Sequence, residues 1–131
     1  MDRSFMERIA MSNEKLTQDE YDALSEVKRG IKGERVSACV GRNTKRLAGL
    51  KLFTIAKNGR ISLSEKGEQV LFLRRCVLAM RALDSDPASV PDADVALFLG
   101  KKSHITAHPD GSFTLSDKGR EALADINQLG L

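Results

Sequence analysis

Two segments of twenty residues, 52 positions apart in this chain, have similar sequences. Residues 52–71 read LFTIAKNGRISLSEKGEQVL and residues 104–123 read HITAHPDGSFTLSDKGREAL, with seven identities between them. Each copy starts with two strand-like runs separated by Asn-Gly or Asp-Gly, a strong signal for an antiparallel hairpin. Each then reaches a serine that can cap a helix. The repeat therefore predicts two copies of a hairpin-then-helix unit.

The helix predicted from Glu65 to about Leu83 lies between the two copies. Its apolar residues extend most of the way round, and only a thin stripe carries arginines. A helix that is apolar on nearly all sides is buried on nearly all sides. We therefore expect this helix to close the first unit and to open the second, so that the two units share one core. A loop from Asp84 to Pro91 follows it.

The first clear helix is predicted to begin at Thr17, where Glu20, three residues on, completes a capping box. It is predicted to end at Gly30 and Gly33, because glycine commonly terminates helices. Residues 1–16 show only weak periodicity, and we treat them as an N-terminal extension.

A helix-turn-helix pattern follows. Glu34 to Val40 forms a short helix candidate, and Gly41-Arg42 predicts a tight break before a further helix that Asn43 can cap. Two short helices around a turn that contains glycine are typical of the motif.

The further helix is expected to have a cationic outer face. On a helical wheel Leu47 and Leu50 point inward. The residues on the opposite side are Arg42, Lys45, Arg46 and Gly49.

Positive charge is concentrated around this motif. Residues 28–60 contain ten basic side chains and one acidic side chain, a net charge of +9, whereas residues 1–27 have a net charge of −4. A basic block that coincides with a helix-turn-helix candidate is the pattern expected of a phosphate-binding face. An ordinary solvated basic surface is the alternative explanation.

Residues 42–71 combine a basic helix, a hairpin with a basic tip and a long helix, in that order. This arrangement resembles the second half of winged helix-turn-helix proteins of the bacterial transcriptional regulator type. The resemblance implies a mainly α fold with small antiparallel β-hairpins as wings, here duplicated around a shared central helix. It assigns residues 17–83 to a winged-helix DNA-binding unit. Residues 84–131 become a second, degenerate unit packed on the shared helix.

One position departs from the family pattern. The recognition helix in these proteins usually ends at a glycine in a left-handed conformation, and Lys51 stands there in this chain. Lysine pays a modest penalty in that conformation.

The resemblance implies sequence-specific binding of double-stranded DNA by a small transcriptional regulator. We expect a cytoplasmic protein, and a homodimer because one short helix rarely gives enough contacts. The expected contacts are Arg42, Asn43, Lys45 and Arg46 on the helix, Lys57, Asn58 and Arg60 at the hairpin tip, and Lys28, Arg29 and Lys32 on the flank. A protein-interaction module whose basic face meets an acidic partner is the main alternative. Structured RNA, recognised by shape and phosphates, is another.

The second copy is expected not to bind DNA. Its counterpart of the recognition helix, Asp92 to Leu99, is acidic at its start and then apolar. We expect Val95, Phe98 and Leu99 to pack into the core or against a partner chain.

Patterns typical of other function classes are weak. His104 and His108 match no zinc-ligand spacing, no phosphate-binding loop occurs, and Cys39 and Cys76 are expected to be reduced core thiols. With 5% aromatic residues and no Trp, stacking platforms for single-stranded nucleic acid are not expected. No apolar run approaches the roughly 20 residues of a membrane span. We therefore expect no cofactor, no metal, no membrane association and no enzymatic activity.

Overall fold

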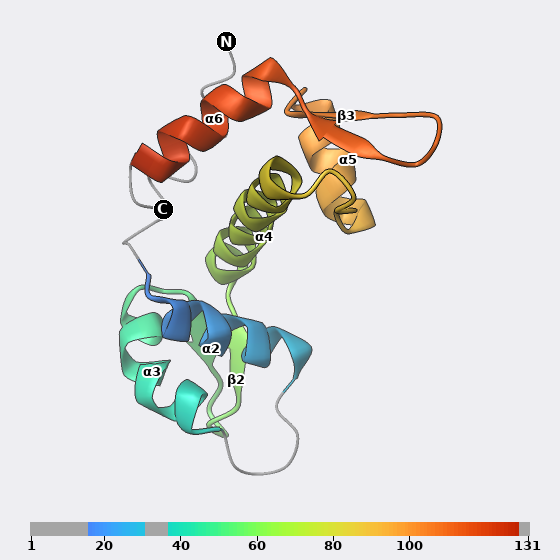
Figure 1. Cartoon of the computed structure of the whole chain (residues 1–131). Helices are drawn as coiled ribbons and strands as arrows, with labels where there is room; N and C mark the ends of the chain where they lie inside the picture. The colour runs from blue at the N-terminus through green and yellow to red at the C-terminus, as the bar shows by residue number, and fades with distance from the viewer. Residues whose placement is uncertain (1–15, 31–36, 129–131) are drawn as a thin grey trace. The chain divides into compact units, whose positions relative to one another are not determined.

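The computed structural model describes residues 16–30 and 37–128 (Figure 1). Their elements are, in chain order, α2 (Gln18–Arg29), α3 (Ala38–Gly49), β1 (Phe53–Ile55), β2 (Ile61–Leu63), α4 (Glu65–Ser85), α5 (Ala93–Lys101), β3 (Ile105–Ala107), β4 (Phe113–Leu115) and α6 (Asp117–Gln128). The described chain is mainly helical with two small antiparallel hairpins, which confirms the coarse prediction. None of its helices combines the length and the apolar content needed to cross a membrane.

The chain divides into two compact units at the boundary between Leu71 and Phe72. We call the described residues up to Leu71 the first unit and residues 72–128 the second unit. In the first unit α2 lies against both α3 and the hairpin, as Figure 1 shows. In the second unit α5 contacts β3, and α6 contacts β4. Most of the predicted extension, residues 1–15, lies outside the described residues.

The two hairpins have the same register. Phe53 pairs with Leu63 in the first hairpin, and Ile105 pairs with Leu115 in the second. Ile105 and Leu115 each lie 52 positions after their counterparts in the first hairpin, so the strand pairing follows the sequence repeat. The hairpins that the repeat predicts are therefore confirmed.

The first hairpin turns through a three-residue loop, one residue longer than the tightest Asn-Gly turn. The Gly59 amide donates to the Ala56 carbonyl at 2.8 Å, and Gly59 has a φ of 85°. Asn58 does not adopt a left-handed conformation. Its Oδ1 instead accepts a hydrogen bond from the Arg60 amide at 3.0 Å. Loops of this kind, with glycine at the left-handed position, are common in hairpins.

A hydrogen-bonded junction joins α3, the first hairpin and α4. The Ser64 hydroxyl donates to the Lys51 carbonyl at 2.6 Å and accepts from the Gly67 amide at 3.0 Å, so Ser64 caps α4 as predicted. Lys51 has a φ of 64° and is therefore left-handed even though it is not glycine. A Cβ on Gly67 would overlap the Leu52 carbonyl oxygen. We call these contacts the helix–hairpin junction.

The second unit repeats this junction. The Ser116 hydroxyl donates to the Ser103 carbonyl at 2.5 Å and accepts from the Gly119 amide at 3.0 Å. Ser103 has a φ of 63°, and a Cβ on Gly119 would overlap the His104 carbonyl oxygen. Each contact has its counterpart at the equivalent position of the first unit, so the repeat extends from sequence to backbone conformation.

The buried residues form two clusters that have no residue in common. Along α4, Val70 and Leu71 belong to the first cluster, whereas Leu73, Cys76 and Met80 are among those in the second. The expectation of one shared core is therefore wrong. The helix is apolar on many sides because its successive turns serve different cores.

The predicted break at Gly41-Arg42 is also wrong. α3 is one continuous helix that begins after Ser37, whose hydroxyl accepts from the Val40 amide at 3.2 Å. The Gly41 amide donates to the Ser37 carbonyl at 2.8 Å, as an ordinary helical residue does. Residues 31–36, between α2 and α3, lie outside the described residues. They include residues 34–36 of the predicted helix from Glu34 to Val40, whereas Ala38 to Val40 belong to α3.

Asn43 is not an N-cap, in contrast to the prediction. Its Nδ2 donates to the Cys39 carbonyl one turn earlier in α3, at 2.8 Å. The same nitrogen donates to the Asp19 carboxylate of α2, at 2.7 Å. A side chain that satisfies backbone and a neighbouring helix in this way fits the interior of a helix.

Gly67→Ala and Gly119→Ala are each expected to lower the free energy of unfolding, by about 1–3 kcal/mol, because the new methyl group overlaps a backbone carbonyl. Gly49→Ala and Gly100→Ala are matched controls, since nothing lies within 4 Å of a Cβ at either helical position. The controls should be neutral or stabilising by up to about 1 kcal/mol. Urea denaturation measures the free energy of unfolding of all four variants. Equal values for the two pairs would contradict the close approach of Gly67 and Gly119 to the backbone carbonyls.

Candidate nucleic-acid interface

The exposed face of α3 carries a lysine between two glycines. Val40 and Leu47 are fully buried in the first core. Gly41, Lys45 and Gly49 lie on the exposed side. Within the described part of the chain, no hydrogen bond or ion pair holds the Lys45 ammonium group. Lys45 is thus positioned as the helix prediction expects, and the small residues beside it leave the helix backbone accessible.

The tip of the first hairpin is exposed and basic. Lys57, Asn58 and Arg60 are all exposed. The Asn58 side chain stabilises the loop, as described above, whereas the charged ends of Lys57 and Arg60 have no partner among the described residues. These two cations can therefore reach an anionic ligand without breaking an internal contact.

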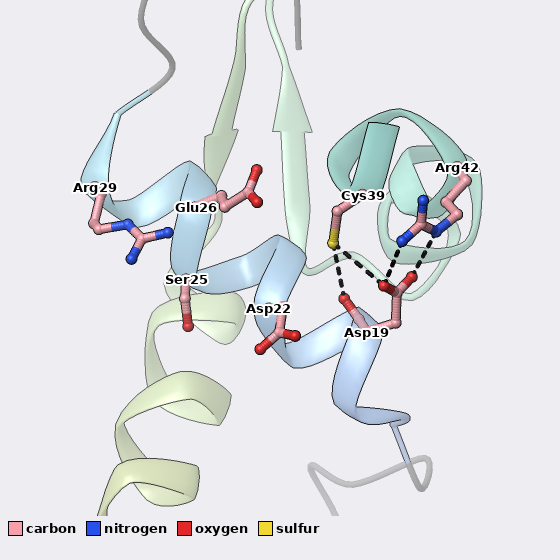
Figure 2. Close-up of a pocket in the computed structure, with 7 residues that line it drawn as sticks. All are labelled: Asp19, Asp22, Ser25, Glu26, Arg29, Cys39 and Arg42. Atoms are coloured by element: carbon pink, nitrogen blue, oxygen red, sulfur yellow. Dashed lines mark hydrogen bonds and ion pairs between the residues drawn. The ribbon is translucent and has the colours of Figure 1, made fainter. Parts of the chain in front are cut away.

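Arg42 forms a forked ion pair with α2. Its Nε donates to Asp19 Oδ2 at 2.9 Å, and its Nη2 donates to Asp19 Oδ1 at 2.6 Å (Figure 2). The hydrogen bonds from Arg42, and then from Asn43, hold the pKa of the Asp19 carboxyl well below its usual range. Both side chains of the pair are substantially exposed, at 58% and 41%. The pair therefore fixes geometry more than it stabilises the fold.

Arg46 lies on the exposed side of α3 as expected, with its side chain 53% exposed, but it is also bonded to a buried carboxylate. Its Nε donates to Glu20 Oε2, and the Glu20 side chain is only 5% exposed. Glu20 Oε1 accepts from the Thr17 amide at 2.8 Å, which confirms the predicted capping box. Burial would raise the Glu20 pKa, but the bonds from Thr17 and Arg46 outweigh it and lower that pKa. Arg46 is therefore an interhelical cross-link.

The predicted flanking contacts lie in mixed-charge surroundings. Lys28 pairs with Glu68 at 2.6 Å. Arg29 lines an open groove beside α2 and α3 that Figure 2 shows, and Lys32 lies outside the described residues. The groove is lined by Asp19, Asp22, Ser25, Glu26, Arg29, Cys39 and Arg42. Its three acidic side chains outnumber its two arginines, so this side of α2 does not attract phosphate.

In the second unit the cation and the carboxylates of the interhelical ion pair are exchanged between the two helices. Arg75 of α4 donates to Asp92 and to Asp94 at the start of α5, each at 2.8 Å. The base therefore lies on the earlier helix and the acids on the later one. Phe72 and Phe98 are the repeat equivalents of Glu20 and Arg46, and their rings meet edge to face with centroids 5.2 Å apart. An ion pair and an aromatic pair thus occupy equivalent positions.

The helix-and-hairpin segments of the two units also differ in net charge. Residues 37–60 contain six basic and no acidic side chains. The equivalent residues 89–112 contain two basic and three acidic side chains, a net charge of −1 with histidine neutral. Leu97, which is 62% exposed, replaces Lys45 on the outer face of the helix. Of the two helix-and-hairpin segments, the first alone therefore has a net positive charge.

The two cysteines are free thiols. Burial, and then the hydrogen bond to Asp19, raise the pKa of Cys39, and burial raises the pKa of Cys76 to about 12. Both thiols therefore remain protonated at neutral pH. Over residues 16–30 and 37–128 no group of three or more His, Cys, Asp or Glu side chains is arranged to hold a metal ion.

Comparison with family models, with curated proteins and with solved structures gives no significant match for this chain. Sequence reasoning missed the ion pairs of Asp19 with Arg42 and of Glu20 with Arg46, which join α2 to the basic helix. The adjacency of the two carboxylates in the first turn of α2, opposite two arginines four residues apart, is the pattern that could have indicated the cross-links.

Arg46→Phe alone is expected to lower the free energy of unfolding by about 1–3 kcal/mol, because it leaves the buried Glu20 carboxylate without its cation. The double variant Glu20→Phe/Arg46→Phe should recover most of this loss, since it copies the Phe72–Phe98 pair of the second unit. Urea denaturation of both single variants and the double variant gives the coupling energy. Losses that simply add would show that the two positions are not equivalent to the aromatic pair.

Proposed function

We propose that the first unit binds double-stranded DNA as a winged helix-turn-helix does, and that the protein is a small cytoplasmic transcriptional regulator. In this proposal α3 enters the major groove and the β1–β2 hairpin is the wing that follows the backbone. The observation that supports it most directly is the contrast within the repeat. Two units with the same hairpin register and the same helix–hairpin junction differ in charge, and the cations lie at the helix and hairpin tip of one of them.

The strongest candidates for phosphate contacts are the cations that no carboxylate neutralises. Lys45 on α3, with Lys57 and Arg60 at the hairpin tip, are exposed and unpaired within the described residues. Lys45 and Lys57 are point charges on flexible stems, which suit contact with a phosphate more than discrimination between bases, and the guanidinium of Arg60 also binds phosphate. These three residues would therefore supply affinity and register.

The remaining predicted contacts take different roles. Arg46 cross-links α3 to the buried Glu20 through Nε, while its side chain remains 53% exposed. Asn43 supports Asp19 and is half-buried. Lys28 is free to exchange Glu68 for a phosphate, because that pair is exposed at both ends and contributes little stability.

A homodimer is part of the proposal. One short recognition helix makes few base contacts, and DNA-binding proteins of this kind gain affinity by placing two copies on a palindromic site. The second unit, with its apolar outer helix, would then serve protein contacts in place of DNA contacts.

An acidic protein partner and structured RNA are the competing ligands. The major groove of duplex RNA is too deep and narrow for a helix to enter. A preference for duplex DNA over RNA of the same sequence would therefore favour groove insertion. A protein complex with charges at its rim loses mainly association rate as salt rises.

The salt dependence of duplex binding tests the proposed contacts. For the full chain, the logarithm of the affinity should fall linearly as the logarithm of the salt concentration rises. The slope should be about −0.9 per phosphate contact. Lys45→Gln, Lys57→Gln and Arg60→Gln should each make the slope shallower by about that amount. Lys101→Gln is the matched control, because it removes the same charge from an exposed position of the second unit.

An unchanged slope in all three variants would show that α3 and its hairpin do not contact the DNA. A shallower slope in Lys101→Gln would show that the second unit contacts the DNA.

A further inference from the structure

One edge of the Arg42 guanidinium is occupied and the other is open. Nε and Nη2 form the side-on fork with Asp19, as Figure 2 shows. Nη1 has no hydrogen-bond partner among the described residues, and one hydrogen of Nη2 also lies on that side. The open edge therefore presents two parallel N–H groups at a side chain that is 58% exposed.

Asp19 is itself held in place by three side chains. Besides the fork from Arg42, its carboxylate accepts from Asn43 Nδ2 at 2.7 Å and from Cys39 Sγ at 3.5 Å. Asn43 is tied in turn to the Cys39 carbonyl at 2.8 Å. The direction of the Arg42 side chain is therefore set by the packing of α2 on α3.

An arginine held in this way is suited to a base and poorly suited to a phosphate. Two parallel N–H donors match the O6 and N7 acceptors on the major-groove edge of guanine. The Asp19 carboxylate beside them neutralises the guanidinium and repels a phosphate. A neutralised, oriented fork contributes little non-specific affinity, but it discriminates strongly among bases.

We propose that Arg42 binds a guanine in the major groove and that Asp19 is its positioning residue. The inference rests on the proposed function, since it requires α3 to lie in the groove. The second unit lacks the arrangement, because Leu71 and Asp94 occupy the equivalent positions. The role belongs to the first unit alone, as the charge contrast requires.

Selection of bound sequences from a library of random DNA duplexes tests the proposal. The full-length wild-type chain should enrich guanine at one position of its site, by roughly tenfold or more over the other bases. Arg42→Lys keeps the charge but loses the fork, so it should lose that enrichment. Asp19→Asn should lose it too, while its affinity for unselected duplexes rises because one negative charge is removed.

Asp22→Asn is the matched control. Asp22 lies one turn further along α2 and lines the same groove, but its carboxylate accepts from Gln18, whereas Arg42 donates to Asp19. The control removes an equal charge, so it should raise the affinity for unselected duplexes similarly and keep the guanine enrichment. A purely structural role for Asp19 would instead lower the affinity for every sequence together.

The outcomes separate this inference from the function beneath it. Guanine enrichment that persists in Arg42→Lys, or that is absent from the wild type, would overturn the inference while duplex binding stands. Loss of enrichment in Asp22→Asn as well would overturn the positioning role. Failure of the wild-type chain to bind any duplex at low salt would overturn the proposed function itself. Circular dichroism checks folding, and Arg42→Lys remains decisive if Asp19→Asn does not fold.

Discussion

The hydroxyl of a serine joins three segments in each unit, and the rest of the structure depends on this bond. Ser64 donates to the carbonyl of the left-handed Lys51 at the end of α3, and it accepts the Gly67 amide at the start of α4. The helix end, the base of the hairpin and the next helix are thereby fixed together. The same bonds recur in the second unit, around Ser116. The junction therefore has the same hydrogen bonds and the same left-handed position in two otherwise divergent sequences.

A backbone fixed in this way leaves the surface free to differ. Lys45 and Leu97 occupy the same place on the outer face of their helices, and one is a cation while the other is apolar. The interhelical contact differs as well, because the Glu20–Arg46 ion pair of the first unit becomes an aromatic pair in the second. The fold is therefore the common element and charge is the variable one. The proposed division between a DNA-binding unit and a protein-binding unit follows from the charge alone.

Local signals predicted the elements well, and long-range contacts accounted for the errors. The capping box at Thr17, the serine cap at Ser64 and the paired hairpins depend on residues close in sequence, and all three are present. Gly41 looked like a break, yet it continues a helix because the cap at Ser37 and the packing of Val40 and Leu47 outweigh its low propensity. A helical wheel sorts residues by angle only. It could not reveal that Arg46 reaches a buried carboxylate 26 residues earlier in the chain.

The central claim is that the first unit binds DNA and that the second, which has the same helix–hairpin junction, does not. Titration of the isotopically labelled full chain with a short duplex, followed through its backbone amide NMR signals, tests it most directly. The account predicts that the largest shifts fall within residues 38–60 and that the equivalent residues 90–112 remain nearly unchanged. Equal shifts in both segments, or larger shifts in the second, would contradict it.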